Sequence, residues 1–428
     1  MSALRRVAEL PQPVRYVLLA LALIVAACVL HWVDQPDDEL VELHVRSPLP
    51  IGAPVFTHPS TPELASWRVV LVPASQVART IADYDDAFVA PVLTLPSARN
   101  DDDGDACPIT TPRYDHLQGY LAHAPEGIDA GAAWRRGTRG AGVWFADIEG
   151  GWNTSHEDLP GDRIALVHGK PMTLPGWREH GTAVLGEVVG IDNDKGVTGI
   201  APDVDRVITS SIGGSESADA IDAAAQQLRA GDVLLIELQG YGPRGKFAPV
   251  EYWDDEFAAI KAATSRGIVV IEAAGNGNAN LDDKIYRGKF DRRVRDSGAI
   301  MVGAGAPPRD GFVDRARLDF SNYGARVDAQ GWGRRVATLD YGDLQRCDDT
   351  AHRHYTDAFS GTSSASPIVA GAAVLLESYA KRTLSPADVR RMLATGSPQT
   401  GNTREHIGPR PDLAKIFSAI ETPATRSR

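Results

Sequence analysis

Cysteine and lysine are both scarce in this chain of 428 residues. The three cysteines, Cys28, Cys107 and Cys347, include no CxxC pair, which excludes the common cysteine-based zinc sites. Only 8 of the 44 basic residues are lysine, and the 56 acidic residues outnumber all basic ones. The resulting net charge of -12 repels nucleic acid, so the composition predicts no DNA or RNA partner.

What the chain does have is enough apolar sequence for a large core. Hydrophobic residues make up 43% and charged residues 23%, which is typical of globular domains. Cys107 and Cys347 lie in polar segments and would be able to pair if the chain is exported. Sequence alone leaves this pairing open, because it does not give the distance between the two residues.

An apolar run occupies residues 16–33 near the N-terminus. Its 18 residues exceed the roughly 7–15 of a cleaved signal core and reach the roughly 17–25 that span a bilayer. Arginines precede the run and aspartates follow it, which predicts that residues 1–15 are cytoplasmic and the rest is exported. We therefore expect a single-pass cell-membrane protein anchored through residues 16–33.

Two other fates of this segment stay open. Residues 25–28, VAAC, resemble the lipobox of bacterial lipoproteins, in which Cys28 would carry the lipid. Ordinary signal cleavage would instead release a secreted protein. All three alternatives export the remainder of the chain.

The rest of the chain divides by composition. Residues 34–112 have mixed character and end in an acidic linker, DDDGD, so they form an N-terminal extension. Residues 113–416 read as one domain, and residues 417–428 as a polar tail. The region shows no internal repeat.

The pattern of residues 113–416 predicts the fold class. Short apolar runs such as GVWFADI, DVLLIEL and IVVIEAAGN alternate with helical segments. Buried runs between helices are typical of a parallel sheet covered on both faces. We expect an α/β, doubly wound, mostly parallel sheet, with its site beyond the carboxyl ends of the strands.

Four polar residues stand where such a site would form. Asp147 ends the first predicted strand, His180 begins a helical run in HGTAVLG, and Asn276 follows a buried strand in AAGNGN. Ser363 lies in FSGTSSASP, directly before an apolar helix predicted from about Ser364 to Lys381. Each residue alone is an ordinary cap or turn residue. Helix capping does not explain the four segments together.

These segments resemble the subtilisin-like serine peptidases, the subtilases, over roughly residues 114–413. The order Asp147, His180, Ser363 is the order of the catalytic triad in that family. The stretches VTGIAP and FSNYG are also similar to the family's sequences. The resemblance implies a serine endopeptidase that cleaves protein or peptide substrates through an acyl-enzyme intermediate and requires no cofactor.

The resemblance also implies a role for each residue. Ser363 would be the nucleophile, His180 its general base, and Asp147 the carboxylate that orients the imidazole. Asn276 would donate to the oxyanion beside the backbone N–H of Ser363.

The Asp147 motif departs from the family pattern. It reads DIEGG, with a second carboxylate at Glu149, which we expect to face solvent. The stretch from Asp147 to His156 is also two residues longer than is usual in the family.

Two secondary sites follow from the same resemblance. Leu238, Gln239 and Gly240 occupy the place of the family's substrate-binding strand, which usually reads SLG. Asp158 and Asn193 match positions at which many subtilases bind calcium, although the same residues also suit a solvated turn.

Overall fold

The computed structural model describes residues 107–347 and 351–422, together with short strands between residues 40 and 94. Those strands are β1 (Leu40–Arg46), β2 (Val55–Thr57), β3 (Trp67–Pro73), β4 (Ala87–Val89) and β5 (Leu93–Thr94). The predicted membrane or signal segment 16–33, with Cys28, lies outside the described residues. Within the described part of the chain, no helix is long and apolar enough to cross a bilayer.

The chain forms two compact units. The first contains residues 1–57 and 68–90, and its strands form a sheet in the order β2-β3-β1-β4, with β1–β4 and β2–β3 antiparallel. The second contains residues 58–67 and 91–428 and carries all the candidate site residues. The domain boundaries expected from the sequence stay predictions.

A seven-stranded sheet forms the centre of the second unit, in the order β14-β13-β12-β9-β6-β8-β7. Every neighbouring pair in it is parallel, which confirms the predicted parallel sheet. Its strands are β6 (Trp144–Glu149), β7 (Ile164–His168), β8 (Arg206–Ser211), β9 (Val233–Ile236), β12 (Val269–Ala273), β13 (Ile300–Gly305) and β14 (Ala329–Trp332).

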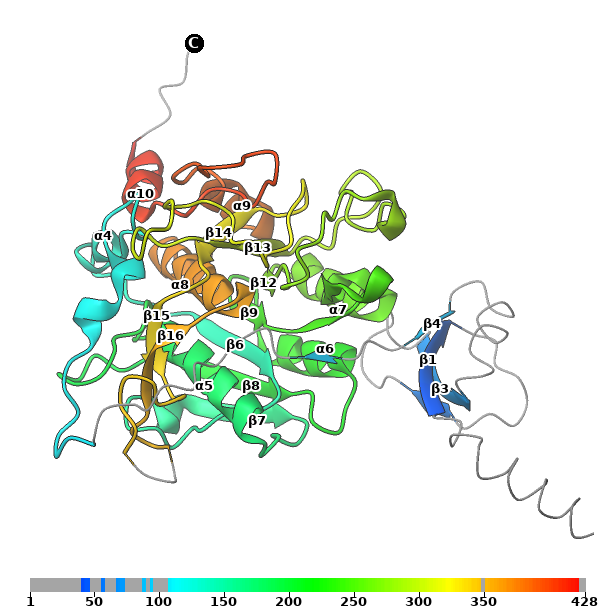
Figure 1. The fold of residues 1–428 in the computed structure, drawn as a ribbon, viewed down its shortest axis with the longest axis horizontal. Coiled ribbons are helices and arrows are strands. Elements are labelled where there is room, and N and C mark those ends of the chain that lie inside the picture. Colours follow the sequence, from blue (N-terminus) through cyan, green and yellow to red (C-terminus); the bar gives the residue numbers. More distant parts are fainter. Residues whose placement is uncertain are drawn as a thin grey trace, which may run out of the picture. The chain divides into compact units, whose positions relative to one another are not determined.

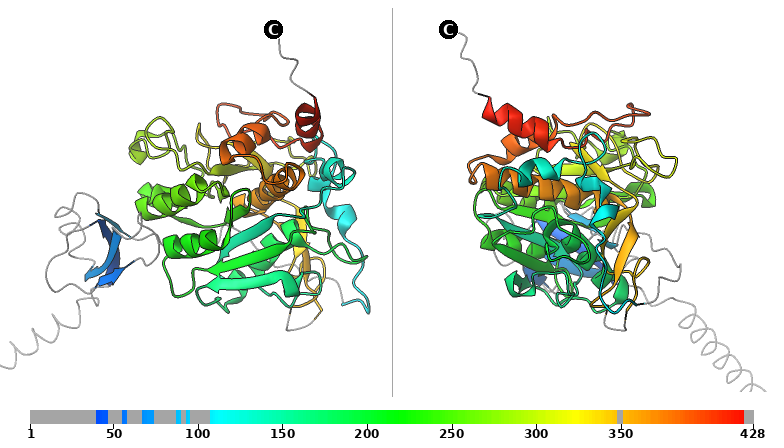
Figure 2. Two further views of the ribbon diagram at one scale, coloured as in Figure 1. Left: turned by 180° about the vertical axis from the view of Figure 1, so that it is seen from behind. Right: turned by 90° about the vertical axis from the view of Figure 1, so that its left-hand side faces the viewer.

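Helices cover both faces of this sheet, as predicted (Figures 1 and 2). Helices α5 (Pro175–Val189) and α8 (Thr362–Tyr379) pack on one face, and α6 (Ser217–Gln227) and α7 (Asp254–Ser265) on the other. Alternate strand residues supply the two cores: Phe145 joins the α5 and α8 side, whereas Ala146 joins the α6 and α7 side. The alternation follows from the two-residue period of a strand.

Smaller elements surround these layers. The antiparallel pair β15 (Val336–Leu339) and β16 (Tyr355–Phe359) leads directly into α8. The remaining α-helices and strands are α4 (Ala130–Trp134), α9 (Pro386–Leu393), α10 (Leu413–Glu421), β10 (Gln239–Tyr241) and β11 (Phe247–Pro249). Short 3-10 helices are η2 (Asp115–Leu117), η3 (Gly119–Leu121), η4 (Gly161–Arg163), η5 (Pro243–Gly245), η6 (Val250–Tyr252) and η7 (Lys284–Tyr286).

Helix α8 begins two residues earlier than predicted, at Thr362. Its cap, Gly361, has φ 110° and ψ -180°, a conformation that is essentially restricted to glycine. Farther along, a Cβ added at Gly371 would lie 2.7 Å from the Cβ of Ile200, so only glycine lets the two segments approach this closely. These two glycines fix where the helix starts and how deeply it is buried.

A disulfide joins Cys107 and Cys347, with their Cα atoms 4.4 Å apart. The two residues are separated by 240 positions in the chain. The bond connects the segment that precedes η2 to the segment between β15 and β16.

Replacing both bonded cysteines by serine should lower the melting temperature by several degrees. Removing a disulfide typically destabilises a protein by about 2–4 kcal/mol, because the unfolded chain regains loop entropy. Differential scanning calorimetry of C107S/C347S against the wild type measures this loss, with C28S as the control for an unrelated thiol. Equal melting temperatures for all three proteins under oxidising conditions would contradict the expectation.

Candidate active site

Two carboxylates stand at the end of β6. Asp147 and Glu149 are two residues apart, so their side chains project from the same face of the strand. Both side chains are fully buried. Asp147 Oδ2 accepts a hydrogen bond from Trp152 Nε1 at 2.7 Å, and its Oδ1 has no hydrogen-bond partner. Burial, together with the neighbouring Glu149 carboxylate, raises the pKa of Asp147 well above its ordinary value.

His180 lies in α5 and is fully buried. Its Nδ1 is 2.5 Å from Glu149 Oε1, which is a short contact between two side chains that water does not reach. Phe359 packs edge-on against the imidazole, with ring centroids 5.5 Å apart. The histidine is thus held by a carboxylate at one nitrogen and by an aromatic ring at its side.

The structure corrects the predicted pairing of Asp147 with His180. The carboxylate at His180 Nδ1 is Glu149, whereas Asp147 accepts from Trp152. The expectation that Glu149 faces solvent is also wrong, because β6 continues through this residue and carries it under α5. The sequence held a signal for this: counted from Glu149, the stretch to His156 loses its two extra residues and matches the family spacing.

Ser363 occupies the first turn of α8. Its Oγ is buried without a hydrogen-bond partner, and so is His180 Nε2. The neighbouring hydroxyls are engaged: Ser364 donates to the carbonyl of Trp332 at 3.0 Å, and Ser366 to that of Thr362 at 2.6 Å. Of these three serines in α8, only Ser363 keeps its hydroxyl available for chemistry.

Asn276 lies in the loop after β12, beside the start of α8. Its Oδ1 accepts from the backbone N–H of Thr362 at 2.9 Å and from the Thr362 hydroxyl at 3.1 Å. Its backbone N–H donates to Gln239 Oε1 at 2.7 Å. These contacts turn the carbonyl end of the Asn276 amide toward Thr362, the residue before Ser363.

Comparison with known proteins identifies the family. A sequence profile described as "Subtilase family" matches residues 151–408, well over half of the chain. The chain belongs to the subtilase family. The matched range contains His180, Asn276 and Ser363, and it begins two residues after Glu149.

Curated relatives agree with this assignment. Subtilisin DY from Bacillus licheniformis is 32% identical over 285 residues, covering 64% of this chain and 91% of the relative. Subtilisin Savinase from Lederbergia lenta is 29% identical over 279 residues, with the same coverage. The match to an alkaline protease from Alkalihalobacillus alcalophilus, also 29% identical, covers 64% of each chain. Subtilases are serine endopeptidases, and this is the class to which the chain belongs.

A solved structure shares the fold. A protease from Pseudoalteromonas arctica aligns with a TM-score of 0.55 at 22% identity. The alignment covers 72% of this chain and 99% of that protein. The similarity supports the subtilisin-like α/β architecture.

In this subtilase the predicted substrate strand is β10 with the residue before it. Leu238 is fully buried in the core under α6, so its side chain faces away from solvent. Gln239 is 1% exposed and supports the Asn276 loop. Gly240 pairs with Leu93 of β5, so a segment of the chain's own N-terminal extension lies antiparallel along this strand.

The predicted calcium residues of the subtilase come together in the structure. Asp158 Oδ2 accepts from the backbone N–H of Val197 at 2.8 Å, and Asp158 Oδ1 is buried without a hydrogen-bond partner. Burial raises the pKa of Asp158 to about 7, and the Asn193 side chain opposes this shift. Calcium prefers six to eight oxygen ligands, so one orphaned carboxylate oxygen beside an amide supplies part of a site. The described residues hold no cluster of three or more His, Cys, Asp or Glu that suits a metal ion.

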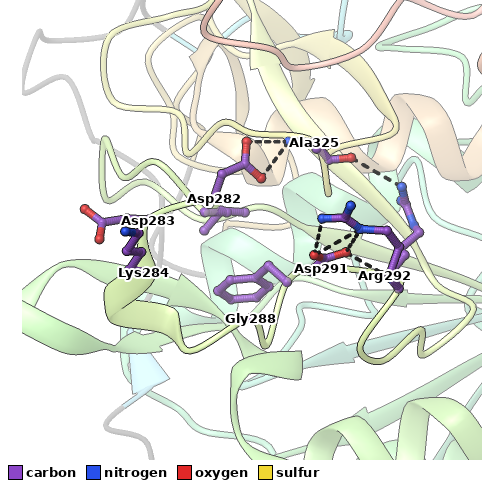
Figure 3. A pocket seen from close by; sticks show the side chains of 10 residues that line it. Asp282, Asp283, Lys284, Gly288, Asp291, Arg292 and Ala325 are labelled. Atoms are coloured by element: carbon purple, nitrogen blue, oxygen red, sulfur yellow. Dashed lines mark hydrogen bonds and ion pairs between the residues drawn. The ribbon is translucent and has the colours of Figure 1, made fainter.

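A cavity of about 490 Å³ is lined by residues 281–284, 288, 290–293 and 325 (Figure 3). Its carboxylates are engaged: Asp282 accepts from the backbone N–H of Ala325, and Asp291 pairs with Arg293 at 2.7 Å. None of the candidate site residues lines this cavity. The cavity therefore offers no alternative centre for the chemistry.

Exchanging the two β6 carboxylates for amides should separate their roles. Glu149→Gln should lower kcat by about 10⁴, the loss seen when other serine peptidases lose the carboxylate that orients the histidine. Asp147→Asn should stay within about tenfold of the wild type, because its amide oxygen still accepts from Trp152. Steady-state hydrolysis of a chromogenic peptide measures both. A larger loss in D147N than in E149Q would restore Asp147 as the partner of His180.

Proposed function

We propose that this subtilase hydrolyses peptide bonds with Ser363 as nucleophile, His180 as general base and Glu149 as the carboxylate that orients the base. The proposal rests on the contact between His180 Nδ1 and Glu149, which leaves Nε2 as the basic nitrogen. No redox or nucleotide cofactor enters this chemistry.

In the acylation step Ser363 Oγ attacks the carbonyl carbon of the scissile bond. His180 Nε2 takes the hydroxyl proton and later delivers it to the leaving amine. Glu149 accepts a hydrogen bond from Nδ1–H, which fixes the tautomer with a bare Nε2 and stabilises the imidazolium. A water molecule then hydrolyses the acyl-enzyme by the same proton route.

The oxyanion is stabilised by two donors in the proposed mechanism. The backbone N–H of Ser363 lies in the first turn of α8, where the helix dipole favours negative charge. The Asn276 amide is the second donor, since Thr362 holds its carbonyl end. Loss of one such donor lowers kcat by about 10²–10³, a figure measured in a subtilisin.

The substrate is proposed to bind as an extended strand along Leu238, Gln239 and Gly240. The antiparallel pairing of Leu93 with Gly240 supports this, because it is the arrangement that an extended peptide would adopt. The same pairing suggests that the N-terminal extension occupies the substrate strand until it is removed. A protein or peptide is therefore the proposed partner.

The proposed location is outside the cytoplasm, with residues 16–33 as the membrane anchor. The disulfide supports export, because such bonds persist in oxidising compartments. Secretion after cleavage, or lipid anchoring at Cys28, would place the domain on the same side of the membrane.

A serine-directed fluorophosphonate probe tests the function. The full chain should form an adduct on Ser363, and mass spectrometry should locate it there. Ser363→Ala should abolish the adduct, whereas Ser364→Ala should retain it, because the Ser364 hydroxyl is engaged with the backbone carbonyls of Trp332 and Gly361. Because the extension covers the substrate strand, labelling is repeated after limited proteolysis upstream of Cys107.

The rival hypothesis is a binding module that has kept the fold without the chemistry. It predicts a folded protein that the probe fails to label both before and after the proteolysis. That result would overturn the proposed function.

Calcium is proposed as a structural ion at Asp158 and Asn193, not as a participant in the chemistry. Saturating Ca²⁺ should raise the melting temperature relative to EDTA. At a hundredfold excess over its Kd, the ion adds about 2.7 kcal/mol to the free energy of unfolding. Asp158→Asn should remove the shift. Asp192→Asn is the matched control, because Asp192 precedes Asn193 in the same loop but pairs with Arg139 at 2.8 Å. Equal melting temperatures with Ca²⁺ and EDTA would argue against the site.

A further inference from the structure

Two buried glutamates have no part in the proposed mechanism. Glu187 and Glu237 are both fully inaccessible to solvent. None of their four carboxylate oxygens has a hydrogen-bond partner. Buried carboxyl groups normally have such partners, so this pair requires an explanation.

The strand register brings Glu237 next to the triad. Ile148 of β6 is paired with Ile236, the last residue of β9, so Glu149 at the end of β6 is next to Glu237, which directly follows β9. Ile148 and Ile236 belong to the core on the α6 and α7 side. Successive residues of a strand point to opposite faces, so Glu149 and Glu237 project toward the face covered by α5 and α8. Glu237 therefore lies beside Glu149, the carboxylate that holds His180, on the side of the sheet that α8 covers.

Glu187 approaches from the helix side. It follows His180 by seven residues in α5, which is two helical turns, so both side chains lie on the same face of the helix. The charge of Glu237 acts on Glu187, and Tyr120 is the other titratable group that Glu187 faces.

The groups that face Glu237 come from three elements. They are Asp147 and Glu149 of β6, Glu187 of α5, and the hydroxyls of Ser363 and Ser366 of α8. None of these groups is a cation, and His180 is already paired with Glu149.

An unpaired ionised carboxylate is very unfavourable in such surroundings. Burial raises the pKa of both Glu187 and Glu237 well above the ordinary value, and neighbouring carboxylates raise it further. The Ser366 hydroxyl, and after it the Ser363 hydroxyl, oppose this rise in the pKa of Glu237. The Ser366 hydroxyl already donates to the carbonyl of Thr362, whereas Ser363 Oγ and both Glu237 oxygens have no hydrogen-bond partner here. Hydrogen bonds in active sites often tighten only when substrate is bound.

We propose that Glu237 is a positioning residue for Ser363, and that it supports the reaction only while it carries a proton. The inference rests on the proposed function. Protonated Glu237 donates its O–H to Ser363 Oγ, which leaves the serine hydroxyl proton directed at His180 Nε2. Ionised Glu237 can only accept, so it draws the serine proton away from the base. Activity is thus lost at alkaline pH when Glu237, a residue outside the triad, ionises.

The sign of the pH dependence follows. An acid with a raised pKa is neutral below that pKa and ionised above it, so activity is lost as the pH rises through the pKa of Glu237. One pH unit above its pKa, Glu237 is about nine-tenths ionised and the reaction about tenfold slower.

The test measures the rate of Ser363 labelling by the fluorophosphonate probe from about pH 5 to about pH 10, in chain treated to release the extension. The wild type should lose rate at the alkaline end. Glu237→Gln keeps an N–H donor for Ser363 and cannot ionise, so its rate should stay level there. Glu237→Leu has no donor and should be slow at every pH.

Glu377→Gln is the matched control. Like Glu237, Glu377 is a buried acid, and burial raises its pKa to about 7, but it lies in α8 near the opposite end of that helix from Ser363. Glu377→Gln should leave the alkaline loss of labelling unchanged. If the loss instead reflected a general effect of buried acids on folding, it would change in E377Q as it does in E237Q.

Thermal stability gives a readout that needs no activity. An acid with a raised pKa contributes stability below its unfolded pKa of about 4.5, and this is lost as the pH rises through the folded pKa. The melting temperature of E237Q relative to the wild type should therefore increase from pH 5 to pH 9. If E237Q does not fold, Glu237→Asp replaces it: the midpoint of the alkaline loss should move.

The outcomes separate the inference from the function. A wild type that labels equally at all alkaline pH values, or an unchanged alkaline loss in E237Q, overturns the role of Glu237 and leaves the triad intact. An unmoved midpoint in E237D does the same. A folded wild type that never labels overturns the proposed function and this inference with it.

Discussion

The contact between His180 and Glu149 is the constraint on which the rest of the site depends. Both side chains are removed from water, so their attraction is little screened, and neither can leave without exposing the other as an unpaired buried group. The length of β6 sets this contact, because the strand must run to Glu149 to reach α5. The helix, in turn, is fixed by its packing against α8, whose first turn carries Ser363.

The second property of this site is that several buried carboxyl groups have no cationic partner. Asp147, Glu187 and Glu237 are all buried, and the imidazole of His180 is already paired with Glu149. A conventional core would have replaced such groups with apolar residues, since each carries a desolvation penalty. Asp147 and Glu237 lie near the carboxyl ends of β6 and β9, and Glu187 lies in α5, which fits a region where stability is given up for control of protonation.

Much of this could be predicted from the sequence, and the parts that could not have physical reasons. Alternating apolar runs and helices led to the parallel sheet, and the glycine-serine segment led to the start of α8 within two residues. Asp147 and Glu149 were not distinguished correctly, because both occupy the same strand face and residue type alone does not say which one reaches the helix. The disulfide stayed open, because a separation of 240 residues carries no information on distance.

The disulfide also has a consequence for how the chain tolerates being cut. Cys347 lies in the segment that precedes β16, and β16 leads straight to the serine of α8. Cleavage at any point before Cys107 therefore creates a new terminus that remains covalently fastened to the nucleophile's own approach segment. This arrangement protects a peptidase against its own activity, because after removal of the N-terminal residues the disulfide still holds the segment at Cys107 against the rest of the domain, so unfolding does not start there.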